Sequence, residues 1–123
     1  METASQALGV LGERLALCFL KQQGYKILLQ NYETPLGEID LIAREGDWLV
    51  FVEVKTRRSD ASGTPADSVT PRKRWQIVKV AQSYLNRYGL HDHPCRFDVV
   101  SVGIRPPGMH EIELIRDAFG ERG

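Results

Sequence analysis

The chain has 123 residues, of which 42% are hydrophobic and 26% charged, so it is expected to form one soluble domain and not a disordered chain. Its 16 basic and 16 acidic residues cancel, which argues against a generic nucleic-acid coat protein. No apolar run is long enough for a membrane span, and the start lacks the basic and apolar regions of a signal peptide. The sequence therefore indicates a cytoplasmic protein that does not enter a membrane.

The pattern of turns and apolar residues predicts an α/β fold built as one domain over residues 1–123, in the order α-β-β-β-α-β-β. Thr3 and Gln6 fit a capping box, and Gly46-Asp47 suits a two-residue type II′ turn because Gly tolerates the positive φ at its first position. The expected elements are a helix at 4–23, strands at 25–33, 37–45 and 48–57, a polar and mobile loop at 58–69, a helix from Thr70 to about Gly89, and strands at 96–104 and 111–115.

Both helices show apolar residues at helical spacing, which predicts the faces that they bury. Trp75 and Tyr84 are expected to pack against the protein, with stacking on nucleobases as the alternative. Gly12 stands inside the first helix, where glycine costs about 1 kcal/mol relative to alanine. That cost predicts a close approach of another group beside Glu13. The expected buried faces comprise Leu8, Leu11, Leu15, Cys18 and Phe19 in the first helix, and Ile77, Val78, Ala81, Leu85 and Tyr88 in the second.

Carboxylates stand inside the second and third strands, where alternation places them on one face. If Gly46-Asp47 forms the turn, Asp40 lies opposite Glu53, and Glu38 lies opposite Lys55. Directly opposed side chains have Cβ atoms about 4.5–5.5 Å apart, and like charges there are destabilising. A divalent cation such as Mg²⁺ or Mn²⁺ between Asp40 and Glu53 would remove that repulsion. The alternative is a solvated face on which Glu38 pairs with Lys55.

Basic residues are concentrated immediately after the acidic strands. Residues 55–79 hold 7 basic and 2 acidic side chains. Arg72, Lys73 and Arg74 occupy the first turn of the second helix, where cations oppose the helix dipole. A phosphate group at that helix start would reverse the penalty, so these three residues and Arg57 are predicted to bind nucleic-acid phosphates. A solvated cluster of charges is the alternative.

Two further features concern cysteine and histidine. Cys18 and Cys95 are not expected to form a disulfide in a reducing compartment. His91, His93 and Cys95 alternate in the sequence, but a zinc site needs three or four ligands in a closed geometry. No second set of such ligands accompanies them, so a zinc site is not expected at this cluster.

Several ordered segments resemble a known family. They are GERLA, NYETPLGEIDLIA, VFVEVKTR, VTPRKR and RFDVV. Together they resemble the YraN-type bacterial family, which is similar to archaeal Holliday junction resolvases within the restriction-endonuclease-like, or PD-(D/E)xK, nuclease superfamily. Asp40 followed by Glu53-Val54-Lys55 resembles the D…(D/E)xK signature, although Ile39 replaces the proline of that pattern. The resemblance implies a mixed central sheet flanked by helices, and it implies a catalytic role for Glu13 on the first helix.

The residues and the resemblance together predict a metal-dependent endonuclease that cleaves DNA, including branched DNA. Asp40 and Glu53 would hold Mg²⁺ or Mn²⁺, and Lys55 and Glu13 would complete the catalytic set. DNA is favoured over RNA, and a homodimer would suit a symmetric junction. Two alternatives stay open. One is a nucleic-acid-binding module without catalysis on the same fold, and the other is a protein-interaction domain.

Overall fold

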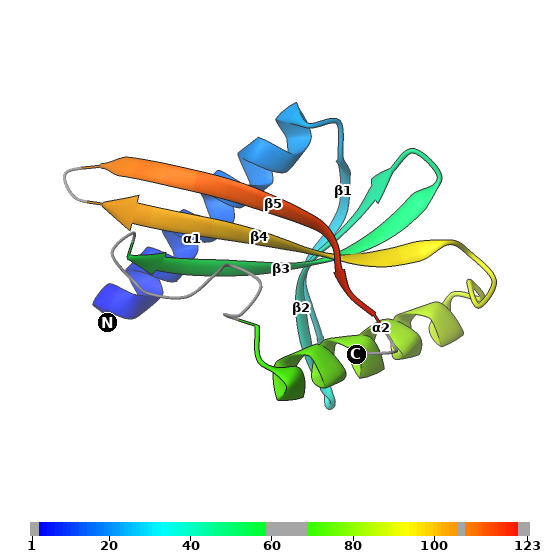
Figure 1. The fold of residues 1–123 in the computed structure, drawn as a ribbon. Helices are drawn as coiled ribbons and strands as arrows, with labels where there is room; N and C mark the ends of the chain where they lie inside the picture. The colour runs from blue at the N-terminus through cyan, green and yellow to red at the C-terminus, as the bar shows by residue number, and fades with distance from the viewer. Residues whose placement is uncertain (1–2, 59–68, 106–107, 121–123) are drawn as a thin grey trace.

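The computed structural model of the chain describes residues 3–58, 69–105 and 108–120, which form a mixed sheet of five strands and two helices (Figure 1). The strands lie in the order β1-β2-β3-β4-β5, with β3 and β4 parallel and the other pairs antiparallel. The predicted α/β class and order of elements are confirmed. The elements are α1 (Ala4–Gln22), β1 (Lys26–Thr34), β2 (Gly37–Glu45), β3 (Trp48–Arg58), α2 (Pro71–Arg87), β4 (Cys95–Arg105) and β5 (Met109–Phe119).

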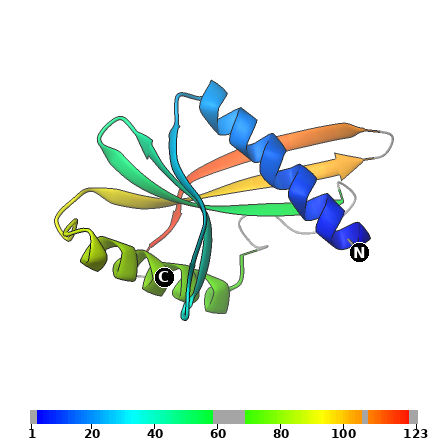
Figure 2. The same ribbon diagram turned by 180° about the vertical axis from the view of Figure 1, so that it is seen from behind.

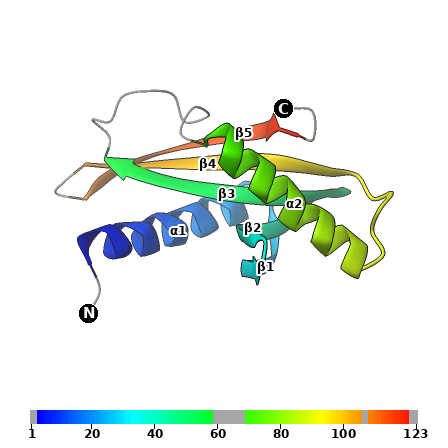
Figure 3. The same cartoon turned by 90° about the horizontal axis from the view of Figure 1, so that it is seen from below.

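The two helices cover opposite faces of the sheet. In the rear view α1 lies across the strands, and in the view from below α2 crosses in front of β3 (Figures 2 and 3). Side chains of β3 alternate between the two resulting cores: Phe51 contributes to the α2 side and Val52 to the α1 side. Because both faces are covered, the central strands are apolar almost throughout, as expected for a parallel pair.

Local signals in the sequence account for the ends of the elements. The capping box at α1 is confirmed, since Gln6 N donates to Thr3 Oγ1 at 3.1 Å and Thr3 N donates to Gln6 Oε1 at 2.8 Å. Thr70 caps α2 and Pro71 occupies its first turn, as predicted. Gly46 has φ 58° at the β2–β3 turn, so the glycine supplies the positive φ that the hairpin requires.

The buried face of α1 differs from the prediction. Gly12, Ala16 and Leu20 face the sheet, whereas Leu11 is 45% exposed and Cys18 is also exposed. Small residues at the first two positions let the helix approach β3 closely. A Cβ on Gly12 would lie 1.7 Å from the Thr56 Oγ1. The close approach expected at Gly12 is therefore confirmed, and the group that approaches is a threonine side chain.

The predictions for α2 are correct for most of its core face and wrong for two aromatic residues. Ile77, Val78 and Ala81 are buried, Leu85 is partly buried, and Tyr84 is 8% exposed and packs as expected. Trp75 is 64% exposed and Tyr88 is 51% exposed, so neither packs into the core. Trp75 lies on the side of the helix turned away from the sheet, whereas Tyr88 caps the C-terminal end of α2, where its ring contacts that of Tyr84 at a centroid distance of 4.8 Å.

The remaining differences concern lengths and undescribed residues. Strand β5 is longer than predicted because an irregularity between Phe97 and Val99 lets the pairing with β4 continue to Phe119. Of the loop predicted at 58–69, Arg58 ends β3 and Val69 is buried, whereas residues 59–68 lie outside the described residues. Across the described ranges, neither helix is both long and apolar enough to cross a bilayer.

Candidate functional site

The register between β2 and β3 follows the prediction as far as the ladder extends. Glu45 pairs with Trp48 and Leu41 pairs with Val52, as the two-residue turn requires. The ladder ends one residue before Asp40 and Glu53. There the Val54 N–H donates to Asp40 Oδ2 at 2.8 Å, so a side chain accepts the hydrogen bond in place of a main-chain carbonyl. The two carboxylates therefore lie where the two strands begin to separate.

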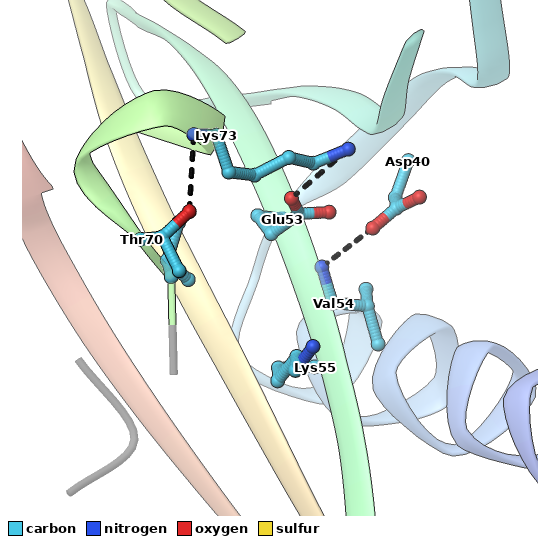
Figure 4. A pocket seen from close by; sticks show the side chains of 7 residues that line it. Asp40, Glu53, Val54, Lys55, Thr70 and Lys73 are labelled. Atoms are coloured by element: carbon cyan, nitrogen blue, oxygen red, sulfur yellow. Dashed lines mark hydrogen bonds and ion pairs between the residues drawn. The ribbon is translucent and has the colours of Figure 1, made fainter. Parts of the chain in front are cut away.

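Asp40 and Glu53 line one pocket, which has a volume of about 360 Å³ (Figure 4). Each of the two residues is only 8% exposed. Figure 4 shows Lys73 reaching from α2 toward Glu53, with Asp40 beside them. The structure thus brings the predicted acidic pair together with two predicted cations, Lys55 and Lys73. The full lining is Asp40, Glu53, Val54, Lys55, Val69, Thr70 and Lys73.

Burial controls the protonation of Glu53. Burial, followed by the hydrogen-bonding contact and negative charge of Asp40, raises the pKa of Glu53 to about 9. The Lys73 Nζ lies 3.8 Å from Glu53 Oε2, and together with Lys55 it opposes this rise. The lysine side chain is 39% exposed, so water weakens its attraction, and burial prevails. Glu53 is consequently protonated at neutral pH in the metal-free protein.

The start of α2 forms one wall of the pocket. Thr70 Oγ1 accepts a hydrogen bond from Lys73 N at 3.2 Å, which fixes the first turn of the helix over β3. Lys55 lies at the exposed side of the pocket. The sequence analysis did not predict that Val69 and Thr70 line this site. The right-handed crossover from β3 through α2 to parallel β4 was the signal that could have placed them there.

Glu13 is not among the residues that line the pocket. It is half-buried on α1, and burial, followed by the charges of Asp40 and Glu38, raises its pKa. Burial and the same Asp40 charge also raise the pKa of Glu38. The negative charge of Asp40 therefore reaches carboxyl groups on both α1 and β2. The pairing of Glu38 with Lys55 is not part of the β2–β3 ladder, because that ladder ends at Leu41.

The other predicted phosphate-binding residues lie around the pocket. Arg57 is on β3 two residues beyond Lys55, and Arg72 is exposed in the first turn of α2. Arg74 is held by the fold, since its Nε donates to Val69 O at 2.8 Å and its guanidinium lies 5.9 Å from the Phe119 ring centroid. Of the four predicted phosphate-binding residues, only Lys73 lines the pocket itself.

The donor set of the pocket fits a hard divalent cation. Among the residues that the structure describes, no three or more His, Cys, Asp or Glu side chains are grouped as metal ligands, and this includes the cluster at 91–95. Mg²⁺ is usually held by one or two carboxylates, and water and substrate phosphate oxygens complete its shell. Asp40 and Glu53, with an open pocket beside them, match that arrangement. They do not match the closed ligand set of a structural zinc site.

A second buried polar cluster, which the sequence analysis missed, lies on the α1 face of the sheet. Asp98 is fully buried and accepts hydrogen bonds from Tyr25 Oη at 2.7 Å, Arg96 Nε at 3.0 Å and Asp117 N at 2.9 Å. Arg96 also pairs with Glu45, which in turn contacts Arg116. The described buried polar atoms of this cluster are satisfied. The cluster therefore joins β2, β4 and β5 to Tyr25, which precedes β1, and leaves no group directed at a ligand.

The comparison with known proteins identifies the family. A family model described as "Uncharacterised protein family UPF0102" matches residues 12–102, a span that runs from GERLA to RFDVV. The UPF0102 protein of Syntrophus aciditrophicus is 50% identical over 95% of this chain and 91% of the relative. The UPF0102 protein of Symbiobacterium thermophilum is 47% identical over 94% of this chain and 98% of the relative. That of Dehalococcoides mccartyi is 45% identical over 92% of this chain and 93% of the relative. The chain therefore belongs to the UPF0102, or YraN-type, family.

Proposed function

We propose that this protein is a metal-dependent endonuclease that hydrolyses phosphodiester bonds in DNA. The observation that carries the proposal is the burial of Asp40 and Glu53 together in one pocket that also contains Lys55. Keeping both carboxyl groups ionised in this buried pocket would cost hydration and mutual repulsion, which is why Glu53 keeps its proton when no cation is bound. A bound cation and a phosphate group would compensate both costs.

The arrangement of elements supports the restriction-endonuclease-like fold that the D…(D/E)xK resemblance implies. The acidic pair comes from neighbouring strands β2 and β3, and α2 connects β3 to its parallel partner β4. The pocket opens at the N-terminal turn of α2. Backbone N–H groups at a helix start favour anions, so a phosphate group would be attracted to the same point as the cation.

Each residue of the pocket would have a separate role in the proposed hydrolysis. Asp40 and Glu53 would hold Mg²⁺ or Mn²⁺, which when bound neutralises phosphate charge and acidifies a coordinated water. Lys55, at the exposed side, would stabilise the negative charge that develops on the phosphate group. Glu13 would support the metal from α1, where burial and the negative charge of Asp40 act on its own carboxyl group. Lys73 would exchange its contact with Glu53 for a contact with the phosphate.

The substrate class follows from the cations and from the resemblance. Arg57 and Arg72 extend the positive charge beyond the pocket, and phosphate contacts of this kind give affinity without sequence specificity. Branched, Holliday-junction-like DNA is the substrate that the resemblance to the resolvases implies. A homodimer would then present two such pockets to two symmetric strands.

The test uses four-way-junction DNA and linear DNA, each with and without Mn²⁺. Asp40→Asn is the informative variant because the asparagine Oδ1 can still accept the Val54 N–H while the charge is lost. Asp47→Asn, in the exposed β2–β3 turn, makes the same chemical change away from the pocket and serves as the control. We expect cleavage by the wild type and by Asp47→Asn, and none by Asp40→Asn. Equal activity of all three proteins would exclude the proposal.

The contact between Lys73 and Glu53 favours a second function, a nucleic-acid-binding module without catalysis. If Lys73 stays paired with Glu53, its positive charge takes the place of a metal ion beside that carboxylate. Such a protein would retain DNA without Mg²⁺, would not cleave it, and would bind at least as well after Asp40→Asn. Calorimetric titration with Mg²⁺ and Mn²⁺ separates the two functions, because only the endonuclease should bind the cation and lose that binding in Asp40→Asn.

A further inference from the structure

The outer side of α2 has a composition unlike the rest of the chain. The helix carries five basic residues and no acidic residue in its 17 positions, although the whole chain is neutral. Arg72, Trp75 and Lys79 are spaced three and four positions apart, so they lie on one side of the helix, and all three are exposed. We call these three residues the outer stripe.

Trp75 is the unexpected member of the outer stripe. At 64% exposed it is the most exposed large hydrophobic side chain among the described residues, so packing gives little reason for an indole there. Lys79 Nζ lies 5.5 Å from the centroid of its ring. At an exposed site such a contact contributes only modestly to stability. The pair combines a flat aromatic surface with a positive charge, which is the combination that binds a base and its phosphate in single-stranded nucleic acids.

The outer stripe begins beside the candidate active site. Lys73, which contacts Glu53 in the pocket, belongs to the same helical turn as Arg72 and Trp75. At 1.5 Å per residue, Lys79 lies about 9 Å further along the helix axis than Lys73. That length corresponds to about two or three stacked nucleotides. Successive residues of a helix are turned by about 100°, so Arg72 lies about a quarter turn from Lys73, and Trp75 lies on nearly the opposite side of α2. A strand whose phosphate occupies the pocket would therefore pass around the helix start at Arg72 to reach Trp75.

We propose that the outer stripe binds an unpaired stretch of the nucleic acid next to the phosphate in the pocket, with one base stacked on Trp75. Inside a DNA or RNA duplex, both faces of a base are covered by its neighbours. An exposed side chain on the outer surface of α2 can therefore stack only on a base that is not enclosed in a duplex. Lys79 and Arg72 would contact the flanking phosphates. The placement next to the cleaved phosphate rests on the proposed function, whereas the preference for unpaired nucleotides can be tested without cleavage.

The binding experiment uses the fluorescence of Trp75. The chain has two tryptophans, so Trp48→Phe leaves Trp75 as the sole emitter. This protein is titrated in EDTA with a single-stranded oligonucleotide and with a blunt duplex of the same sequence. We expect the single strand to quench the emission, because a stacked base contacts the indole directly, and the duplex to leave it nearly unchanged. Quenching of equal depth by both DNAs would overturn the proposal.

Affinity measurements on variants give the second readout. Stacking on an aromatic side chain is worth about 5- to 150-fold in affinity per base, so Trp75→Ala should weaken single-strand binding by that factor and change duplex binding little. Trp75→Phe should restore much of the loss and Trp75→Leu should not. Trp48→Ala, which removes an exposed tryptophan from the β2–β3 turn, is the matched control and should bind as the wild type does. An equal loss for both DNAs in Trp75→Ala would overturn the proposal, as would equally effective competition by polyglutamate, which carries charge without bases.

The failure of this inference can be told apart from the failure of the proposed function. If Mn²⁺-dependent cleavage is seen and Trp75→Ala binds both DNAs as the wild type does, the outer stripe has no role in recognition and the endonuclease proposal stands. If Trp75→Ala selectively loses single strands but no DNA is cleaved, the binding assignment stands and the endonuclease proposal fails.

Discussion

Replacing Glu53 by glutamine should make the metal-free protein more stable at neutral pH. The carboxyl has a pKa of about 9 in the folded chain, against 4.5 for an ordinary glutamate. The folded chain therefore keeps a proton on Glu53 that the unfolded chain releases above pH 4.5. As a result, the free energy of unfolding falls as pH rises from 4.5 toward 9. At pH 7 the cost is about 3 kcal/mol. Glutamine removes this titration, and its amide N–H can donate to Asp40 as the protonated glutamate does.

The assay is urea unfolding at a series of pH values from 5 to 8.5. We expect Glu53→Gln to gain up to about 3 kcal/mol over the wild type at pH 7 and to differ little at pH 5, with a flatter pH profile. Glu45→Gln is the control of opposite sign. Hydrogen bonding to Arg116, which outweighs the opposing effect of burial, lowers the pKa of Glu45. Its replacement should therefore reduce stability at neutral pH.

One outcome would refute the reasoning about the pocket. If Glu53→Gln unfolds at the same or lower urea concentration as the wild type, with an unchanged pH profile, then Glu53 is ionised and its contact with Lys73 stabilises the fold. Addition of Mg²⁺ gives a related check, because a cation requires the ionised carboxylate. Mg²⁺ should stabilise the wild type more strongly as pH rises and should have little effect on Glu53→Gln.

Two further predictions concern the fold. Gly12→Ala should lower the free energy of unfolding by about 1–3 kcal/mol, because the new methyl group collides with Thr56. Gly9→Ala, which has nothing within 4 Å of the added Cβ, should raise it by up to about 1 kcal/mol. Chemical denaturation of both variants checks this, and equal effects would contradict it. Tyr25→Phe should cost about 1.5–3 kcal/mol, because it removes the 2.7 Å hydrogen bond to fully buried Asp98, and a melting temperature equal to that of the wild type would show that the bond contributes nothing.

The local part of the architecture could be predicted from the sequence, and so could the site's acidic pair. The Gly46-Asp47 turn fixed the register of β2 and β3, and the register placed Asp40 and Glu53 on one side of the hairpin. These inferences succeed because the residues involved are close in sequence and a tight turn allows few alternatives. The caps at Thr3 and Thr70 were predictable for the same reason.

The parts that could not be predicted depend on contacts between distant segments. Apolar spacing did not reveal the buried side of α1, because its contact with β3 is set by the small residue Gly12 against Thr56. Likewise, nothing in the local sequence indicates that Asp98 accepts a hydrogen bond from Tyr25, which lies 73 positions earlier, just before β1. The exposure of Trp75 was missed because the hydrophobicity of tryptophan predicts burial, whereas its exposure depends on which side of α2 it occupies.

The end of the β2–β3 ladder explains why the candidate site lies where it does. A continuous ladder would separate the two faces of the sheet and keep groups from α1 and α2 apart. Because the Asp40 side chain accepts the Val54 N–H, the main chains of the two strands stop pairing at that point while β3 continues to pair with β4. The charge of Asp40 then reaches Glu13 on α1, while Lys73 on α2 contacts Glu53. The hydrogen bond from Val54 thus marks the opening and holds Asp40, one of the two carboxylates that we propose to bind the metal. Because asparagine can keep that bond, Asp40→Asn is a cleaner test than Asp40→Ala.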